Sequence, residues 1–258
     1  MDAHTGVLLV GHGTRDPNGT RQFFELSDRL SDSLPGIPME AALLEFQQPT
    51  IPEAWDSLHR RGVRHVHVAP LLLFAAGHAK QDIPDEIGSC QESTPGMTFD
   101  QSRPLSRHAA ILELVESRVR ESLTQIPSPP ERIAIVMVGR GNRDPCAQAD
   151  MRVMTEIIRK RVSVETTTTA FYAMAQPALP GVLASVASTE RYDQIIVYPH
   201  LLFEGRLLEA IKRQVSEAAE QFPWTQFRLA EHLGPDRLVA LAIRGRIEQA
   251  SATGVECR

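Results

Sequence analysis

Short apolar runs alternate along this chain with segments of helical periodicity. Three of the runs have the length and branched content of buried strands: residues 7–10, 42–46 and 66–74. Between the first two runs, apolar side chains recur at helical spacing: Phe23, Leu26, Leu30 and Leu34. This alternation predicts an α/β fold, a doubly wound parallel sheet with right-handed crossovers and helices on both faces.

Helix starts are marked by capping residues. Asp16-Pro17 reads as an N-cap followed by proline in the first helical turn, and Asp144-Pro145 repeats it. Thr50, followed three positions later by Glu53, has the spacing of a capping box. We therefore expect helices to begin directly after Asp16, Thr50 and Asp144.

The chain is internally duplicated. Residues 10–17, VGHGTRDP, return as VGRGNRDP at 138–145, and Gln48-Pro49 returns as Gln176-Pro177 at the same displacement. The run PLLLF from residue 70 returns as PHLLF from residue 199, one position out of register. Matches in the same order at nearly one spacing indicate two copies of one unit. We expect tandem domains at 1–124 and 131–258, joined by a proline-rich linker and leaving a cleft between them.

Composition narrows the class of protein. The 258 residues are 42% hydrophobic and 23% charged, which favours a folded chain over a disordered one. A net charge of -5 without a basic run argues against nucleic acid as the main partner. No apolar stretch reaches the length of a membrane span, and the first residues lack the pattern of a signal peptide, so we expect no membrane association and a cytoplasmic location. The three cysteines form no Cys-x-x-Cys pair and are interpreted as buried or incidental thiols.

Three polar residues of the first copy fall at the expected carboxyl ends of its strands. His12 follows the first strand, Glu45 ends the second and His78 comes just after the third. Ligands of open parallel sheets bind at that edge. Two imidazoles and a carboxylate suit a divalent first-row ion, and they can also accept protons near neutral pH. Taken singly, each has a plainer interpretation: a turn residue, a surface carboxylate and the exposed start of a helix.

The second copy changes all three residues while keeping their surroundings. His12 becomes Arg140, Glu45 becomes Ala173 and His78 becomes Arg206. Arginine is a poor metal ligand but binds carboxylates through two parallel hydrogen bonds. The first copy is therefore predicted to handle a metal and the second to face an anionic ligand. Further cations are expected to help bind that ligand, unless they are ordinary surface charges: Arg15, Lys80 and Arg143.

At these residues the chain resembles the sirohydrochlorin chelatases, the class II chelatase family of siroheme and cobalamin synthesis. The matching segments are VGHGTRD at 10–16, LEF at 44–46 with PTIPEA at 49–54, and PLLLF at 70–74 through GHAKQDIP at 77–84. The resemblance covers essentially the whole chain in its two-domain long form. It implies that His12, Glu45 and His78 are the metal-binding and catalytic residues, with the sirohydrochlorin macrocycle in the cleft between the domains.

The resemblance also implies what reacts. The metal would be a substrate, Fe²⁺ or Co²⁺ and possibly Ni²⁺, with no permanently bound cofactor. Long cobalt-inserting relatives often carry a histidine-rich tract or a C-terminal cysteine-bound cluster, and this sequence has neither, which favours iron. Two other functions remain open: a carrier that binds tetrapyrrole or metal without catalysis, and a nucleotide-binding enzyme, suggested only by Gly11-His12-Gly13.

Other histidines receive structural interpretations. His65 and His67 alternate along the third predicted strand and are expected to be packed or edge residues rather than ligands. Met151 and Met154 are expected in a helix core. The role of His200, beside Pro199, is left open, as is the oligomeric state.

Overall fold

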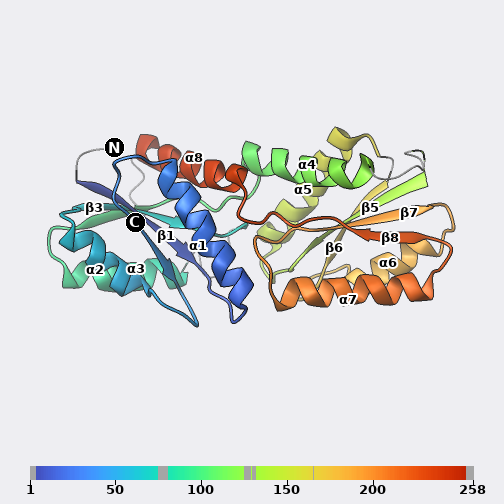
Figure 1. The fold of residues 1–258 in the computed structure, drawn as a ribbon, viewed down its shortest axis with the longest axis horizontal. Coiled ribbons are helices and arrows are strands. Elements are labelled where there is room, and N and C mark those ends of the chain that lie inside the picture. Colours follow the sequence, from blue (N-terminus) through green and yellow to red (C-terminus); the bar gives the residue numbers. More distant parts are fainter. Residues whose placement is uncertain (1–3, 75–80, 125–128, 130–131, 165, 254–258) are drawn as a thin grey trace. The chain divides into compact units, whose positions relative to one another are not determined.

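A computed structural model describes residues 4–74, 81–124, 129, 132–164 and 166–253. Strands and helices alternate throughout these residues (Figure 1). The first repeat contains β1 (Thr5–Gly11), α1 (Pro17–Asp32), β2 (Met39–Leu43), α2 (Ile51–Arg60), β3 (His65–Pro70), α3 (Ile83–Ser93), β4 (Thr98–Gln101) and α4 (Ala109–Thr124). The second repeat contains β5 (Ile133–Gly139), α5 (Pro145–Val162), β6 (Thr166–Phe171), α6 (Leu179–Ala187), β7 (Gln194–Pro199), α7 (Arg206–Gln221), β8 (Gln226–Leu229) and α8 (Arg237–Thr253).

The strands form two parallel sheets with the same topology. The first has the order β2-β1-β3-β4 and the second the order β6-β5-β7-β8. Matched strands also share their register, since Thr5 pairs with His65 in the first sheet and Ile133 with Gln194 in the second. The predicted fold class and the duplication are confirmed. The expected cleft between the domains stays a prediction.

Two predicted strand boundaries are wrong. The strand expected over 66–74 ends at Pro70, because the amide of Leu72 donates to the carbonyl oxygen of Pro70 at 2.9 Å and turns the chain out of the sheet. The strand expected over 42–46 is Met39–Leu43, and Phe46 has a φ of 72°, which is incompatible with a strand. Glu45 therefore belongs to the loop beyond β2.

The two compact units of the structure do not coincide with the two sequence repeats, because the last helix of each repeat belongs to the unit formed by the other repeat. One unit contains residues 1–110 and 235–258, and the other contains 111–234. The predicted boundaries 1–124 and 131–258 follow the sequence repeat, whereas α4 from Ile111 onward belongs to the second compact unit and α8 belongs to the first. In Figure 1, α8, at the red end of the colour scale, lies beside the blue α1. Arg244 of α8 donates to the carbonyl oxygen of Ser33, just after α1, at 3.2 Å.

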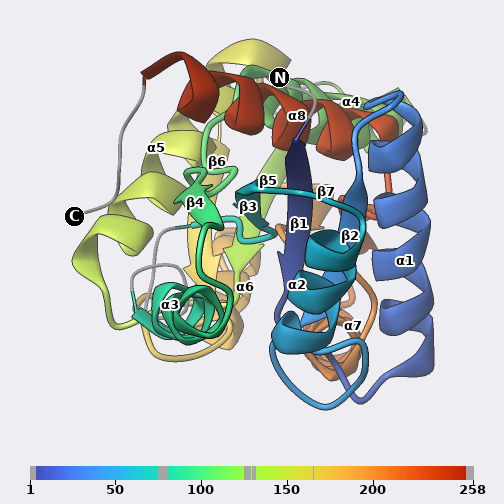
Figure 2. The ribbon, with the colours of Figure 1, turned by 90° about the vertical axis from the view of Figure 1, so that its left-hand side faces the viewer.

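Each unit buries apolar side chains on both faces of its sheet. In the first unit, α2 and α3 cover one face through a cluster that includes Trp55, Leu58 and Ile87. The opposite face is covered by α1 and α8, whose contact is visible in Figure 2. In the second unit, α6 and α7 pack on one face through Leu183 and Ile211. Met151 and Met154 of α5 are fully buried, as predicted.

The predicted helix caps are confirmed. The Asp16 side chain accepts from the amides of Asn18 and Gly19, and Asp144 accepts from Cys146 in the second unit. Thr50 and Glu53 form the complete capping box at the start of α2. These caps set where each helix begins and therefore how each preceding loop returns from the sheet. None of the helices among the described residues is long and apolar enough to span a membrane.

Candidate metal and tetrapyrrole site

His12 and Glu45 are joined through their backbones at the carboxyl edge of the first sheet. Where β1 and β2 end, the amide of Leu44 donates to the carbonyl oxygen of Gly11 at 2.9 Å, and the amide of Glu45 donates to that of His12 at 3.0 Å. His12 is half-buried and Glu45 is exposed. Strand-like pairing thus continues into the loops and holds His12 and Glu45 on adjacent segments. Their part in binding a metal stays a prediction.

Glycine at position 13 permits this close approach. Gly13 has a φ of +88°, in the left-handed region that favours glycine. A β-carbon at this position would overlap the backbone carbonyl of Glu45. The second glycine of the Gly-His-Gly sequence is therefore required by the backbone conformation. This requirement explains the motif without a nucleotide-binding loop.

The second unit repeats the backbone of this site with different side chains. The amide of Ala173 donates to the carbonyl oxygen of Arg140 at 2.9 Å, and Gly141 has a φ of +86° with the same close approach to Ala173. The hydrogen bond and the glycine are thus common to both units, whereas the imidazole and the carboxylate occur only in the first. The contrast seen in the sequence is preserved in three dimensions.

The third predicted ligand, His78, lies outside the described residues, as does Lys80. The described chain leaves β3 at Pro70 and re-enters a helix before Ile83, the first residue of α3. By sequence, both residues fall between β3, which neighbours β1 in the sheet, and α3. The parts of His78 and Lys80 in the site stay predictions.

The remaining predicted cations lie at the carboxyl edges of the two sheets. Arg15 is exposed, and its guanidinium carbon lies 4.9 Å from the centre of the Phe46 ring, a cation–π arrangement. Arg140 and Arg143 are exposed in the loop between β5 and α5, and Arg206 is the exposed first residue of α7. Because all three arginines of the second unit are exposed, their guanidinium groups are accessible to an anion in solvent.

Sequence reasoning missed a pair of exposed apolar residues at the same edge. Phe46 directly follows Glu45 and is 51% exposed, and Met174 directly follows Ala173 and is 48% exposed. Both have positive φ values, 72° and 57°. Side chains other than glycine in this conformation cluster at functional sites. The sequence does contain a signal, because both copies have an apolar residue at this position. In the sequence alone, however, Phe46 looks like the last residue of a buried strand, and only the structure shows that the strand ends at Leu43.

His200 is a core residue of the second unit. Its side chain is 2% exposed and its ring centre lies 6.1 Å from that of Tyr198. Burial lowers the pKa of His200 to about 3, which keeps the ring neutral. The equivalent position of the first unit holds Leu71, also buried. His200 therefore occupies an apolar core position rather than the exposed edge.

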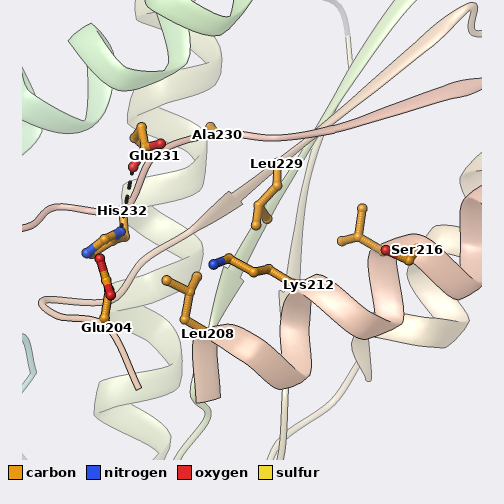
Figure 3. A pocket seen from close by; sticks show the side chains of 9 residues that line it. Glu204, Leu208, Lys212, Ser216, Leu229, Ala230, Glu231 and His232 are labelled. Atoms are coloured by element: carbon orange, nitrogen blue, oxygen red, sulfur yellow. Dashed lines mark ion pairs between the residues drawn. The ribbon is translucent and has the colours of Figure 1, made fainter. Parts of the chain in front are cut away.

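A cavity of about 520 Å³ opens between α7 and the segment after β8 (Figure 3). It is lined by Glu204, Leu208, Lys212, Val215, Ser216, Leu229, Ala230, Glu231 and His232. Lys212 is paired with Glu209 outside the cavity, at 2.8 Å. Burial lowers the pKa of His232, while the neighbouring Glu231, 3.9 Å away, opposes the shift. A lining with two carboxylates and a paired lysine does not suit a polyanion, and we assign it no part in the site.

The CbiX family model matches this chain twice, over residues 6–122 and again over residues 134–250. The chain belongs to the CbiX family. The two matches coincide with the two repeats, so the whole CbiX unit is duplicated, including the exchanged last helices. The family resemblance inferred from the sequence motifs is confirmed.

Proteins similar to this chain include chelatases named for different metals. The sirohydrochlorin cobaltochelatase of Priestia megaterium is 30% identical over 244 residues, which cover 94% of this chain and 79% of that protein. The sirohydrochlorin ferrochelatase of the same organism is 30% identical over 234 residues, covering 91% and 86%. Among solved structures, SirB from Bacillus subtilis with Fe³⁺ superimposes with a TM-score of 0.83 at 27% identity, covering 97% of this chain and 96% of that one.

Proposed function

We propose that this protein is a sirohydrochlorin chelatase, a lyase-class enzyme that inserts a divalent metal ion into sirohydrochlorin. The membership of the CbiX family and the similarity to named sirohydrochlorin chelatases over more than 90% of the chain support this reaction. The observation that carries the assignment to residues is the 3.0 Å backbone hydrogen bond between Glu45 and His12, which puts a carboxylate and an imidazole on paired segments at the ligand-binding edge.

The proposed reaction exchanges two protons for one ion. Insertion of M²⁺ forms bonds from the metal to the ring nitrogens and releases the two protons carried by those nitrogens. His12 and His78 hold the incoming ion through ring nitrogens, and Glu45 adds a carboxylate ligand. As the ring nitrogens replace these ligands, the freed imidazole and carboxylate accept the protons. Glu45 is exposed, so a proton taken up there can pass to solvent.

The macrocycle is proposed to bind through its carboxylates and its face. The peripheral carboxylates of sirohydrochlorin suit arginine, which forms charge-assisted bidentate hydrogen bonds. Arg140, Arg143 and Arg206 supply such groups in the second unit, while Arg15 and Lys80 supply cations in the first. The exposed ring of Phe46 offers an apolar surface for the macrocycle next to the proposed metal ligands.

The identity of the physiological metal is a narrower proposal. Fe²⁺ is favoured because the sequence lacks a histidine-rich tract, and Co²⁺ is the alternative. The relatives named for cobalt and for iron are equally identical to this chain, at 30%. A His–Glu–His set accepts several first-row ions, so side-by-side insertion rates for Fe²⁺, Co²⁺ and Ni²⁺ under anaerobic conditions decide between them. The proposal places this reaction in the cytoplasm.

The assignment is tested by insertion kinetics of single variants. His12→Ala and Glu45→Gln are each expected to lower kcat for Fe²⁺ or Co²⁺ insertion by at least tenfold while the protein stays folded. His4→Ala is the matched control, because His4 is an exposed histidine at the opposite end of β1. The absorbance of the metallated product gives the rate. A wild-type rate no faster than the reaction without protein would contradict catalysis, and a folded His12→Ala protein with wild-type kcat would contradict the residue assignment.

A further inference from the structure

Three ligand-type side chains meet at the other end of the first sheet. His65 and His67 lie on β3 with their side chains on the same face, and Asp100 lies on the edge strand β4, where it pairs with His67. The Asp100 carboxylate places Oδ1 2.6 Å from Nδ1 of His67 and Oδ2 3.2 Å from Nε2 of His65. His65 pairs with Thr5, the first residue of β1, whereas His12 follows its last residue. The cluster is therefore separate from the edge that carries His12 and Glu45.

The two ring nitrogens of His67 face different partners. Ser251 of α8 lies 3.2 Å from Nε2 of His67, and its hydroxyl donates to the carbonyl oxygen of Ile247 at 3.0 Å. His67 thus turns Nδ1 toward the Asp100 carboxylate and Nε2 toward the Ser251 hydroxyl.

Two members of the cluster are withdrawn from solvent. His67 is 4% exposed, and Asp100, whose Oδ1 lies 2.6 Å from Nδ1 of His67, is half-buried. Charged groups inside proteins are paired with one another or coordinate metal ions. The cluster thus brings two imidazoles and one carboxylate together in a partly shielded place.

His65 shows the same division of its two nitrogens. Nε2 faces Asp100, and Nδ1 lies 2.8 Å from the hydroxyl oxygen of Thr98. Metal-bound histidines almost always hydrogen-bond an outer partner through the nitrogen that is not ligated. Ser251 and Thr98 supply this outer partner for His67 and His65 respectively. Each imidazole is thus oriented with one nitrogen toward Asp100 and the other toward a hydroxyl.

We propose that His65, His67 and Asp100 form a second binding site for a divalent first-row metal ion, with Zn²⁺ or Co²⁺ as suitable occupants. The ligand atoms all lie within 4.8 Å of one another. Donors at about 2.1 Å from one ion can be at most about 4.2 Å apart, so small side-chain rotations complete the site. Two imidazoles and one carboxylate match the ligand preference of these ions and leave further positions for water. A bound ion would fasten the edge strand β4 to β3 and, through Ser251, to α8.

The second unit provides an internal comparison. By strand register, Gln194 takes the place of His65, Ile196 that of His67 and Arg228 that of Asp100. The Nε of Arg228 donates to the side-chain oxygen of Gln194 at 3.4 Å. A guanidinium thus stands where the carboxylate stands in the first unit, and the matched positions offer no imidazole. The proposed site is confined to one copy, and glutamine is the residue that the second unit has at the position of His65.

The test counts Zn²⁺ bound by the whole protein without sirohydrochlorin. A His12→Ala/Glu45→Gln protein, which lacks two ligands of the proposed insertion site, is expected to retain one tightly bound Zn²⁺ in equilibrium dialysis. Its Tm is expected to rise with Zn²⁺ concentration. Adding His65→Gln or Asp100→Asn is expected to weaken that binding at least tenfold and to abolish the rise in Tm. His4→Gln is the matched control, an exposed histidine at the same end of the sheet, and should retain both effects.

The outcomes separate the two proposals. If His65→Gln, which copies the residue of the second unit, folds and leaves Zn²⁺ binding unchanged, the proposed site is wrong. It is equally wrong if the His12→Ala/Glu45→Gln protein binds no Zn²⁺, and Asp100 then serves only as a hydrogen-bond partner of the two histidines. Failure of this test leaves the proposed chelatase reaction untouched, because insertion is measured with variants of the opposite edge.

Discussion

The backbone amide of Glu45 donates to the carbonyl oxygen of His12 at 3.0 Å, beyond the last paired residues of their strands. The same bond joins Ala173 to Arg140 in the second unit at 2.9 Å. One backbone arrangement therefore holds an imidazole beside a carboxylate in one copy and a guanidinium beside a methyl group in the other. This comparison allows variants of one unit to serve as controls for the other.

Gly13→Ala and Gly141→Ala form a matched pair. In both, the new β-carbon overlaps a backbone carbonyl, of Glu45 or of Ala173, and side-chain rotation cannot relieve the overlap. Each variant is expected to lose about 1–3 kcal/mol of stability, since a residue other than glycine is strained at this φ. Only Gly13→Ala should lower kcat for metal insertion, because only it displaces a proposed metal ligand. Thermal denaturation and insertion kinetics of both proteins check this, and unchanged kcat in folded Gly13→Ala would contradict it.

Arg206→Ala is expected to weaken sirohydrochlorin binding while leaving metal binding intact. Loss of one charge-assisted hydrogen bond costs about 1.5–3 kcal/mol, so the Kd for sirohydrochlorin should rise roughly tenfold or more. Arg213→Ala is the control, because Arg213 lies on the same helix and pairs with Glu217 at 3.8 Å. Fluorescence or absorbance titration with the macrocycle measures the Kd. Equal effects of the two substitutions would mean that Arg206 acts only through net charge.

His200→Leu is expected to make the protein less sensitive to acid. Because burial lowers the pKa of His200 to about 3, its ring stays neutral in the folded protein, while in the unfolded chain it takes up a proton below its ordinary pKa of about 6.5. The stability associated with the neutral ring is fully present above pH 6.5 and falls by about 1.4 kcal/mol per pH unit between pH 6.5 and pH 3.

Urea denaturation at pH 7 and pH 5 measures this difference. The wild type should lose about 2 kcal/mol more than His200→Leu over that interval. Leucine is chosen because the equivalent position of the first unit holds the buried Leu71. His4→Leu, an exposed substitution that keeps His200, should retain the full acid sensitivity. Identical pH dependence of the wild type and His200→Leu would show that His200 does not control acid stability.

Capping offers a prediction that is independent of function. Thr50 caps α2 with a capping box, whereas the equivalent Ala178 precedes α6 without a side-chain cap. Thr50→Ala should lower the free energy of unfolding by about 1 kcal/mol, because the capping hydroxyl is lost. Ala178→Ser should raise it by a few tenths to about 1 kcal/mol, because the new hydroxyl can accept from an amide of the first helical turn. Changes in Tm of opposite sign would support this, and a Tm decrease in Ala178→Ser would contradict it.

Much of the fold could be predicted because its signals are local. The caps at Asp16 and Thr50 join atoms two or three residues apart, so a short stretch of sequence is enough to specify them. The difference between His12 and the equivalent Arg140 can be seen in the sequence for a similar reason. Gly13 and Gly141, required by the same turn in both copies, align the two positions. Strand ends were predicted less well, because Pro70 and Phe46 leave the sheet within apolar runs that look continuous.

By itself, the sequence determined the alternation of strands and helices, the duplication and the residues that distinguish its two copies. Only the tertiary structure decided that the last helices are exchanged between the units and that Asp100 lies against His65 and His67. The physical reason is the distance along the sequence over which the deciding interactions act. Helix periodicity and capping are satisfied within a few residues, whereas the register of β3 with β4 and the choice of sheet beneath α8 depend on packing between residues far apart, for which the same local pattern permits several partners.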